Sequence, residues 1–399
     1  MKRSRFQLQK KDTIVLTLLI TCIIGSVYVW VNYYQSIQRG WYILQKPFIT
    51  KTIQCSSDAP SFMYQLMRQA VTQQKSMSNQ LAYVSPQGSF YHCESGWEDG
   101  FRGKMGLTED SRFIYASVSK IVTSMMVLDL INQNKIKLDQ KLVDIIDIPP
   151  PKDERINKIT VAMLLQHSAG FDRMKTYTPM LTMGKKPWCP TQIAYLSDVK
   201  LDFDPDTQYQ YSNVGYCLLG AIVEKTTGLP FREAVEKKYN IGNRNIKFIN
   251  SEFLADEIQY DYRNEVFYGD FWRRHFDFKE SLSAVGGLSG SAKEITFLAK
   301  EMLKEKPLNL LSRSSHPCAI NLQGGCYGLA MEPYQKQGKN FTVFNKSGYF
   351  PGVEADIFID DKNGVLTFIR GATTPERKSL LQLRQDVYQH LFEFYNNDN

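Results

Sequence analysis

The sequence contains no CxxC pair, no cysteine and histidine residues at zinc-site spacing, and only five histidines in all. It also has no internal repeat, no low-complexity tract and no glycine-rich loop in its first strand-helix unit. These absences argue against a zinc protein, a repeat protein and a phosphate-loop nucleotide enzyme. With 43% hydrophobic and 22% charged residues over 399 positions, the chain instead has the material for a globular body. We expect it to need no metal and no cofactor.

The N-terminal segment carries more than half of the net positive charge of the chain. The net charge of the whole chain is +7, and the first thirteen residues supply +4 of it through five basic residues opposed only by Asp12. The +3 that remains is scattered over the rest of the chain, which is too little for a nucleic-acid-binding surface. We therefore expect no nucleic-acid partner.

The longest apolar segment follows this basic segment. Eighteen residues from Ile14 to Val31 carry no charge, which is just enough to span a bilayer. Basic residues ahead of such a span keep that end in the cytoplasm, so the rest of the chain should be exported to the periplasm. A cleaved signal peptide would have a shorter apolar core and a small-x-small site, and a lipoprotein would need a small residue before Cys22.

The sequence thus predicts a protein of the bacterial inner membrane that crosses it once, with a periplasmic catalytic domain. We expect four parts: a cytoplasmic basic segment (1–13), a transmembrane anchor (14–34), a linker (35–57) and one catalytic domain (58–399).

Six cysteines lie in the part expected to be exported, and an even number there permits disulfides. Six cysteines allow fifteen sets of pairings, and spacing alone does not choose among them. Cys318 and Cys326 flank a short glycine-rich stretch and form the favoured pair, whereas Cys217 lies in an apolar run and is interpreted as a small buried hydrophobic residue. The six are Cys55, Cys93, Cys189, Cys217, Cys318 and Cys326.

Strand-like segments occur at both ends of the expected catalytic domain. LAYVSP and SFYHCESG form a predicted hairpin, and sheet character returns in 342–345, 355–359 and 365–370. Between them, residues 118–131 are apolar on all sides and predict a buried helix, and 138–280 predict a helical insert rich in loops. We expect an α/β (α+β) fold with an antiparallel sheet flanked by helices and an all-helical insert domain.

Two helices in the C-terminal part of the chain are predicted from capping signals. Ser291 is followed three residues later by Glu294, a capping-box pattern that opens a helix. The last helix is expected to begin with Thr374 as N-cap and Pro375 at its first position.

The first chemical motif opens the predicted buried helix. Ser117 and Lys120 are three residues apart, so their side chains share one helix face. A lysine held in a dry site loses basicity and can take the proton of a neighbouring hydroxyl. The alternative is that Ser117 only caps the helix. Ser197 and Lys200 match the same spacing but open no apolar helix, so they are set aside.

Two further motifs follow in the chain. Tyr211 and Asn213 offer a phenol that could relay protons and an amide that could hold a substrate amide. Lys346, Ser347 and Gly348 offer a cation, a hydroxyl and a position without a side chain against which a ligand backbone can lie. Each motif is common by chance, but their order is not.

In this order the motifs resemble those of the penicillin-recognising serine hydrolases, in particular the class C β-lactamase type that includes D-Ala-D-Ala carboxypeptidases and family VIII esterases. The likeness covers about residues 60–395 and rests on FIYASVSK, ITVAMLLQHSAGF, PDTQYQYSNVGYCLLGAIVEKTTG, SAVGGLSGSAKEI and FNKSGYFPG. Ala169 and Asp206 depart from the family pattern without touching the three chemical elements.

The resemblance implies a role for each motif residue. Ser117 would be the nucleophile, Lys120 its proton acceptor, and Tyr211 the residue that protonates the leaving group and then activates water. Asn213 would bind a substrate amide, and Lys346 would supply positive potential over Tyr211 and a substrate carboxylate.

By the same resemblance the backbone N–H groups of Ser117 and Tyr349 would form the oxyanion hole, and His167 would be structural. The aromatic and basic segment 268–278 would border the cleft. The implied substrate is a small D-Ala peptide of peptidoglycan, with a β-lactam or an ester as alternatives. The alternative from another class is a non-catalytic binding protein on the same fold.

Overall fold

A seven-stranded antiparallel sheet lies at the centre of the computed structural model, in the order β1-β3-β2-β10-β9-β8-β7. The structure describes residues 10–73, 76–98, 100–175, 187–250, 254–258, 277–304, 306–314, 318–350, 352–371 and 377–397. The strands are β1 (Gln54–Cys55), β2 (Ser78–Val84), β3 (Phe90–Ser95), β7 (Glu332–Tyr334), β8 (Val343–Phe350), β9 (Val353–Asp360) and β10 (Val365–Gly371).

The sheet joins the two ends of the expected catalytic domain. β2 and β3 form the predicted hairpin, and β8, β9 and β10 are the predicted late strands. The two groups meet where β2 pairs with β10, with Ser78 opposite Gly371. Because helices cover both faces, every residue of β2, β9 and β10 is buried.

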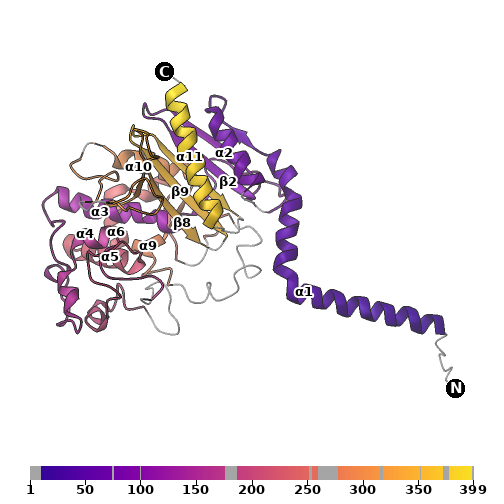
Figure 1. The fold of residues 1–399 in the computed structure, drawn as a ribbon, viewed down its shortest axis with the longest axis horizontal. Coiled ribbons are helices and arrows are strands. Elements are labelled where there is room, and N and C mark those ends of the chain that lie inside the picture. The colour runs from indigo at the N-terminus through magenta and orange to yellow at the C-terminus, as the bar shows by residue number, and fades with distance from the viewer. Residues whose placement is uncertain are drawn as a thin grey trace.

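One face of the sheet is covered by α2 (Ser61–Thr72) and α11 (Arg377–Asn397), which lie side by side over it in Figure 1. Both helices contribute apolar side chains to a core with the strands beneath, for example Leu66, Phe358 and Leu383. The N-cap expected at Thr374 and Pro375 lies outside the described residues.

The opposite face carries α10 (Ala292–Met302) and the helices that hold the site. Ser291 Oγ accepts a hydrogen bond from Glu294 N–H at 3.2 Å, which confirms the predicted N-cap of α10. The predicted buried helix is α3 (Lys120–Asn132), entered through a 3₁₀ turn, η1 (Ala116–Ser119). Eleven of the thirteen residues of α3 are buried, as its uniformly apolar sequence predicts.

The described part of the region 138–280 contains short helices separated by loops, as expected. They are η2 (Leu142–Asp144), η3 (Glu154–Lys158), α4 (Val161–Leu165), η4 (Ile193–Asp198), α5 (Asn213–Thr227), α6 (Phe231–Tyr239) and η5 (Ile241–Arg244). Its described part departs from an all-helical insert at β5 (Lys247–Phe248), which pairs with β6 (Leu288–Gly290), itself paired with β4 (Phe113–Ile114). Backbone pairing ties the insert to the catalytic body.

A single long helix, α1 (Lys10–Thr50), precedes the body. Its first part, Lys10–Tyr33, is long and apolar enough to cross a membrane, with a mean hydropathy of 2.4, and none of it is buried against the rest of the protein. Figure 1 shows this part projecting away from the body.

Residues 35–50, which we expected to belong to a linker, continue α1 as a helix. Packing explains the difference, because Gln45 and Ile49 are buried and Lys46 Nζ donates to the Thr72 carbonyl of α2 at 2.7 Å. The end of α1 is therefore part of the body's surface.

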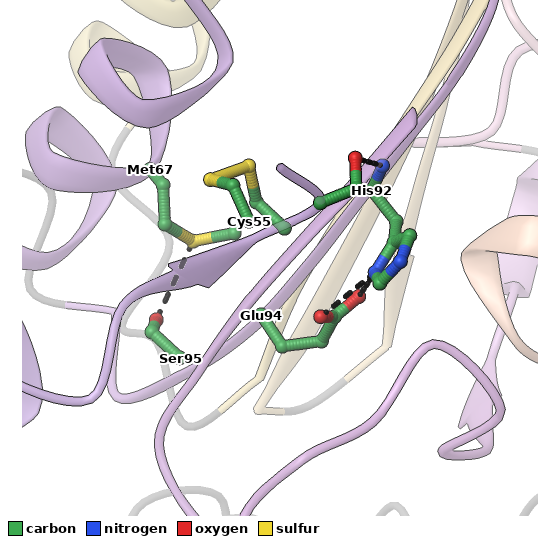
Figure 2. Close-up of a disulfide and its surroundings, with 7 residues drawn as sticks. Cys55, Met67, His92, Glu94 and Ser95 are labelled. Atoms are coloured by element: carbon green, nitrogen blue, oxygen red, sulfur yellow. Dashed lines mark hydrogen bonds and ion pairs between the residues drawn. A yellow bond between two sulfur atoms is a disulfide. The ribbon is translucent and has the colours of Figure 1, made fainter. Parts of the chain in front are cut away.

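Three disulfides connect the six cysteines in pairs. Cys55 and Cys93 face each other across β1 and β3, which fixes the segment after α1 to the sheet. Figure 2 shows this disulfide beside Met67 of α2, on the side of β3 opposite the His92–Glu94 pair. Cys318 pairs with Cys326, as favoured.

The interpretation of Cys217 as an unpaired hydrophobic residue is wrong, because it is bonded to Cys189. The partner lies 28 residues earlier, in a segment that packs on α5 only in the folded chain. Cys22 of α1 is free and exposed.

Strands β9 and β10 carry a buried cluster of charged side chains. Arg370 has no solvent exposure, and its guanidinium lies 2.6 Å from Glu354 and 3.5 Å from Asp356. Burial raises the pKa of Glu354, and the charge of Arg370 opposes that rise. The cation therefore compensates two carboxylates that would otherwise be buried without a counter-charge.

Replacing Arg370 with Met should lower the free energy of unfolding by about 3–5 kcal/mol, because both carboxylates lose their partner in a buried site. Urea unfolding followed by circular dichroism measures the change. The exposed pair Lys152–Asp198 provides the control, since Lys152→Met should cost less than about 1 kcal/mol. Equal costs for the two variants would show that the buried cluster does not need Arg370.

Candidate active site

Ser117 lies in η1, at the point where the chain enters α3. The residue before it, Ala116, has a φ of +46°, a left-handed conformation that is uncommon for any residue other than glycine. β8 packs directly behind this turn. A Cβ atom at Gly348 would overlap the Tyr115 carbonyl oxygen and lie 2.8 Å from Ser117 N. Only glycine lets β8 approach the serine this closely.

Ser117 Oγ contacts two of the residues that the sequence places with it. Lys120 Nζ lies 3.0 Å away, and Tyr211 OH donates to it at 2.9 Å. Lys120 Nζ also donates to the Val285 carbonyl at 2.6 Å, in the short helix α9 (Ser283–Gly286). Ser197, from the rejected motif, instead donates to the Ala194 carbonyl at 2.9 Å. The structure thus brings together the serine, lysine and tyrosine of the first two motifs.

Lys120 is fully buried, and burial is the largest cause that lowers its pKa well below the ordinary lysine value. The positive charge of Lys346 lowers it further. The lowered pKa favours the neutral amine, whose lone pair can accept the Ser117 hydroxyl proton.

Lys346 approaches the site from β8. Its Nζ donates to Tyr327 OH at 2.6 Å and lies 4.8 Å from the centroid of the Tyr211 ring. Burial lowers the pKa of Lys346 to about 7, with Glu332 acting to raise it and Arg384 to lower it further. Burial also raises the pKa of Tyr211, so that its phenol keeps its proton at neutral pH.

Aromatic rings form the wall behind these groups. His167 lies 4.4 Å from the Tyr211 ring and 4.8 Å from the Tyr327 ring, between centroids. Its Nδ1 accepts a hydrogen bond from Ser212 N–H at 3.2 Å, and burial lowers its pKa well below the ordinary value, which keeps the ring neutral. The structural role expected for His167 remains a prediction, and these contacts are compatible with it.

The sequence interpretation did not find Tyr327 or the carbonyl of Val285. Tyr327 follows Cys326 in a segment without regular structure, and no spacing relates it to Lys346. The role of a backbone carbonyl cannot be predicted from residue type, because every residue has one. Both were found only because folding brings their segments to the two lysines.

Asn213 is the first residue of α5 and follows Tyr211 by two positions. Its Oδ1 atom is buried and has no hydrogen-bond partner in the part of the chain that the structure describes. Such an acceptor can bind an N–H group of a ligand. Tyr349, whose backbone N–H was expected in the oxyanion hole, lies in β8 with its side chain exposed to 43%, and its backbone role stays a prediction.

The hydroxyl of Ser347, which the third motif offers to a ligand, is bonded to other side chains of the protein, and its substrate-binding role stays a prediction. Its Oγ accepts a hydrogen bond from Arg384 of α11 at 2.7 Å and also bonds Asp356 of β9. Alternate side chains of a strand point to opposite faces, so Lys346 and Gly348 face η1 while Ser347 faces α11. Arg384 is also bonded to Glu332 at 3.0 Å. The segment 268–276, expected to border the cleft, lies outside the described residues.

The Beta-lactamase family model matches residues 65–386 of this chain. The chain belongs to the beta-lactamase family. A Dichelobacter nodosus protein named as fimbrial assembly protein FimD, serogroup D, is 48% identical over 97% of this chain and 98% of its own length. A Salmonella typhimurium protein named as a D-alanyl-D-alanine carboxypeptidase is 26% identical over 46% of this chain and 48% of its own.

Solved structures share the fold of this family member. The D-amino acid amidase of Ochrobactrum anthropi SV3, complexed with L-phenylalanine amide, superposes with a TM-score of 0.63 at 19% identity, covering 81% of this chain and 95% of its own. A penicillin-binding protein of Bacillus halodurans gives a TM-score of 0.60 at 19% identity over 82% and 99%. Family membership makes the chain a serine hydrolase of the β-lactamase and penicillin-binding type.

The charges beside Lys346 should set the pH range of the enzyme. Acylation that needs Lys346 as a cation should decline as the pH rises through about 7. Glu332→Gln removes the charge that favours the cation, so the decline should shift to lower pH, whereas Arg384→Met should shift it to higher pH. The pH dependence of labelling by a fluorescent penicillin or a fluorophosphonate measures both.

The opposite directions of these two shifts separate electrostatics from damage to the fold. Loss of structure alone would lower labelling at every pH without moving the midpoint. Midpoints that move in the same direction in both variants would contradict the assignment to Lys346.

Proposed function

We propose that the protein is a membrane-anchored hydrolase that forms an acyl-enzyme on Ser117. The observation that carries the proposal is the double contact of Ser117 Oγ with the Lys120 amine and the Tyr211 phenol. A nucleophile with a neutral base and a protonated acid at hydrogen-bond distance has the groups that acyl transfer requires.

The chemistry follows from these positions. Lys120 accepts the Ser117 proton as Oγ attacks the carbonyl carbon, and Tyr211 gives its phenol proton to the leaving group. The proton held by Lys120 then returns to Tyr211. In the second half the Tyr211 phenol proton passes to Lys120, and Tyr211 then takes a proton from the water that attacks the acyl carbon. Lys120 returns its proton to Ser117 Oγ as the acyl bond breaks, which restores the starting state. The N–H groups of Ser117 and Tyr349 would stabilise the oxyanion in both halves.

Lys346 and Asn213 would hold the substrate. The ammonium of Lys346 lies against Tyr211 and can attract a carboxylate to the site. The free acceptor of Asn213 fits an amide N–H. A peptide that ends in a carboxylate offers both groups, which favours D-Ala-containing peptidoglycan peptides, cut as by a carboxypeptidase or endopeptidase. The name of the Salmonella relative supports this choice.

Two other substrates are compatible with the same residues. A β-lactam antibiotic also carries an amide and a carboxylate. The O. anthropi neighbour is named as an amidase, an enzyme that cleaves an amide bond. A carboxylic ester needs only the serine, its base and the oxyanion donors. Enzymes that act on these three substrate classes differ in the rate of deacylation more than in the residues that carry out acylation.

The location proposed for this chemistry is the periplasmic face of the inner membrane. The first part of α1 would be an uncleaved anchor, with the basic segment before it in the cytoplasm. The three disulfides fit a body that folds in an oxidising compartment. An enzyme held there lies beside the peptidoglycan.

Labelling the full chain with a fluorescent penicillin and with a fluorophosphonate tests the acyl-enzyme. Wild type should form an adduct with at least one probe, Ser117→Ala should form none, and Lys120→Ala should acylate about 10²–10⁴ times more slowly because it lacks the base. Lys200→Ala, from the rejected motif, is the matched control and should label as wild type does.

The probe that labels identifies the substrate class. A penicillin adduct that persists indicates a peptidase, rapid turnover indicates a β-lactamase, and labelling by the phosphonate alone indicates an esterase. Absence of any Ser117-dependent adduct would overturn the enzyme proposal and favour a binding protein on this fold.

A second candidate function is a part in fimbrial assembly, favoured by the FimD relative that matches 97% of this chain. Hydrolysis of wall peptides beside an assembling fibre and non-catalytic binding to an assembly protein are both compatible with that name. The two differ in whether Ser117 is needed.

Counting surface fimbriae by electron microscopy in a deletion strain tests this second function. If hydrolysis serves assembly, the wild-type gene should restore the fibres and Ser117→Ala should not. Restoration by Ser117→Ala at equal protein level would assign the role to binding. Unchanged fibres in the deletion strain would remove fimbrial assembly from the functions of this protein.

A further inference from the structure

The second half of α1 carries an apolar stripe that the body leaves uncovered. Ile37, Trp41, Leu44 and Phe48 recur at spacings of four, three and four, so they share one face of the helix. Their side chains are exposed to 41%, 53%, 64% and 40%. The buried residues Gln45 and Ile49 lie on the neighbouring face of the helix, and Lys46, which bonds the Thr72 carbonyl, lies opposite the stripe. We call these four residues the α1 stripe.

One loop of the body extends the α1 stripe. The Phe101 ring contacts both Trp41 and Phe48 edge-on, with centroid distances of 6.5 and 5.7 Å. The guanidinium of Arg102 lies 4.4 Å from the Phe48 ring centroid. Lys104 and Met105, further along this loop, are also exposed. Aromatic and aliphatic side chains bordered by cations form the composition that suits the interface between lipid tails and headgroups.

The distance of the α1 stripe from the candidate membrane span also favours contact with the membrane surface. A helix that ran straight on from Tyr33 would carry Trp41 about 12 Å and Phe48 about 22 Å further. The headgroup layer on each side of a bilayer is only about 5–8 Å deep. The whole stripe can therefore meet lipid only if the second half of α1 lies along the membrane surface.

Figure 1 shows that α1 turns sharply about midway, so that its first part points away from the body while its second half runs along the body. The second half packs with α2 on the body side. With the first part across a bilayer, the second half lies along the surface of that bilayer. The α1 stripe, which lies on a different face from the buried Gln45 and Ile49, then faces the lipid.

We propose that the α1 stripe, together with Phe101, Arg102 and Met105, is a membrane-docking surface that holds the catalytic body against the anionic lipid of its own membrane. The proposal rests on the anchor proposed above. The disulfide between Cys55 and Cys93 makes this docking rigid, because it fixes the segment after α1 to the sheet that also carries Lys346. The active site is then held at one height and one orientation above the bilayer.

Quenching of tryptophan fluorescence by brominated lipid tests the docking in the full chain. The protein is reconstituted into vesicles of phosphatidylcholine and phosphatidylglycerol, with and without brominated acyl chains. Trp41→Phe should remove part of the quenching, since Trp41 would contact lipid. Trp30→Phe reports the anchor and should do the same, and Trp188→Phe, which removes a buried residue of the body, should not.

The outcomes distinguish the two proposals. If Trp30 is not quenched and the protein does not float with the vesicles, the anchor fails and the docking with it. If Trp30 is quenched but Trp41 is not, the anchor stands and the docking is overturned. Protection of Trp41 from iodide without quenching by lipid would assign the stripe to a protein contact instead, and would also overturn it.

A charge in the stripe gives an independent readout. Leu44→Glu should abolish the quenching of Trp41 while leaving that of Trp30 and the hydrolysis of a soluble ester unchanged, because Leu44 is remote from the site. Leu322→Glu, at a similarly exposed leucine of the body, is the control and should change neither. Retained quenching of Trp41 in Leu44→Glu would contradict the proposal.

Discussion

The burial of two lysines beside one serine is the constraint on which the site depends. The amines of Lys120 and Lys346 lie 5.4 and 4.8 Å from the centroid of the Tyr211 ring, where burial opposes a charge on either of them. The charge of Lys346 lowers the pKa of Lys120 further, which favours the neutral form of Lys120. Lys346 keeps a pKa of about 7 because Glu332 partly offsets its burial. One amine can thus act as a base while its neighbour supplies positive potential.

The two faces of β8 have different tasks. Toward η1, Lys346 contributes a cation that donates to Tyr327, and Gly348, which has no side chain, lets the strand lie against Ser117. Toward α11, Ser347 is bonded to Arg384 and Asp356, which belong to an ion network that continues to Arg370. Among the described residues this network makes no hydrogen bond to Ser117, but it fixes the strand that carries Lys346. A change in α11 can therefore alter the chemistry through the position and charge environment of Lys346.

Much of the fold follows from local patterns in the sequence. The hairpin of β2 and β3, the all-round apolar helix α3 and the Ser291 N-cap of α10 have short-range causes, and the structure confirms each of them. The sequence predicts a linker rather than the continuation of α1 to Thr50, because this stretch mixes polar and apolar residues and is stabilised by tertiary packing of Gln45 and Ile49 on the body. The bond between Cys189 and Cys217 was missed for the same kind of reason, since spacing alone contains no pairing information.

The sequence by itself determined the residue types of the site and their order: a serine three residues before a lysine on a helix, a tyrosine before another helix, and a lysine before a glycine in a strand. Only the tertiary structure decided that Ser117, Lys120 and Tyr211 meet at one oxygen atom, that Tyr327 and the Val285 carbonyl complete the lysine contacts, and that Ser347 faces away. The reason is physical. Helix and strand periods fix which neighbours share a face, whereas a pKa and a hydrogen bond depend on which distant segments burial brings within a few ångströms.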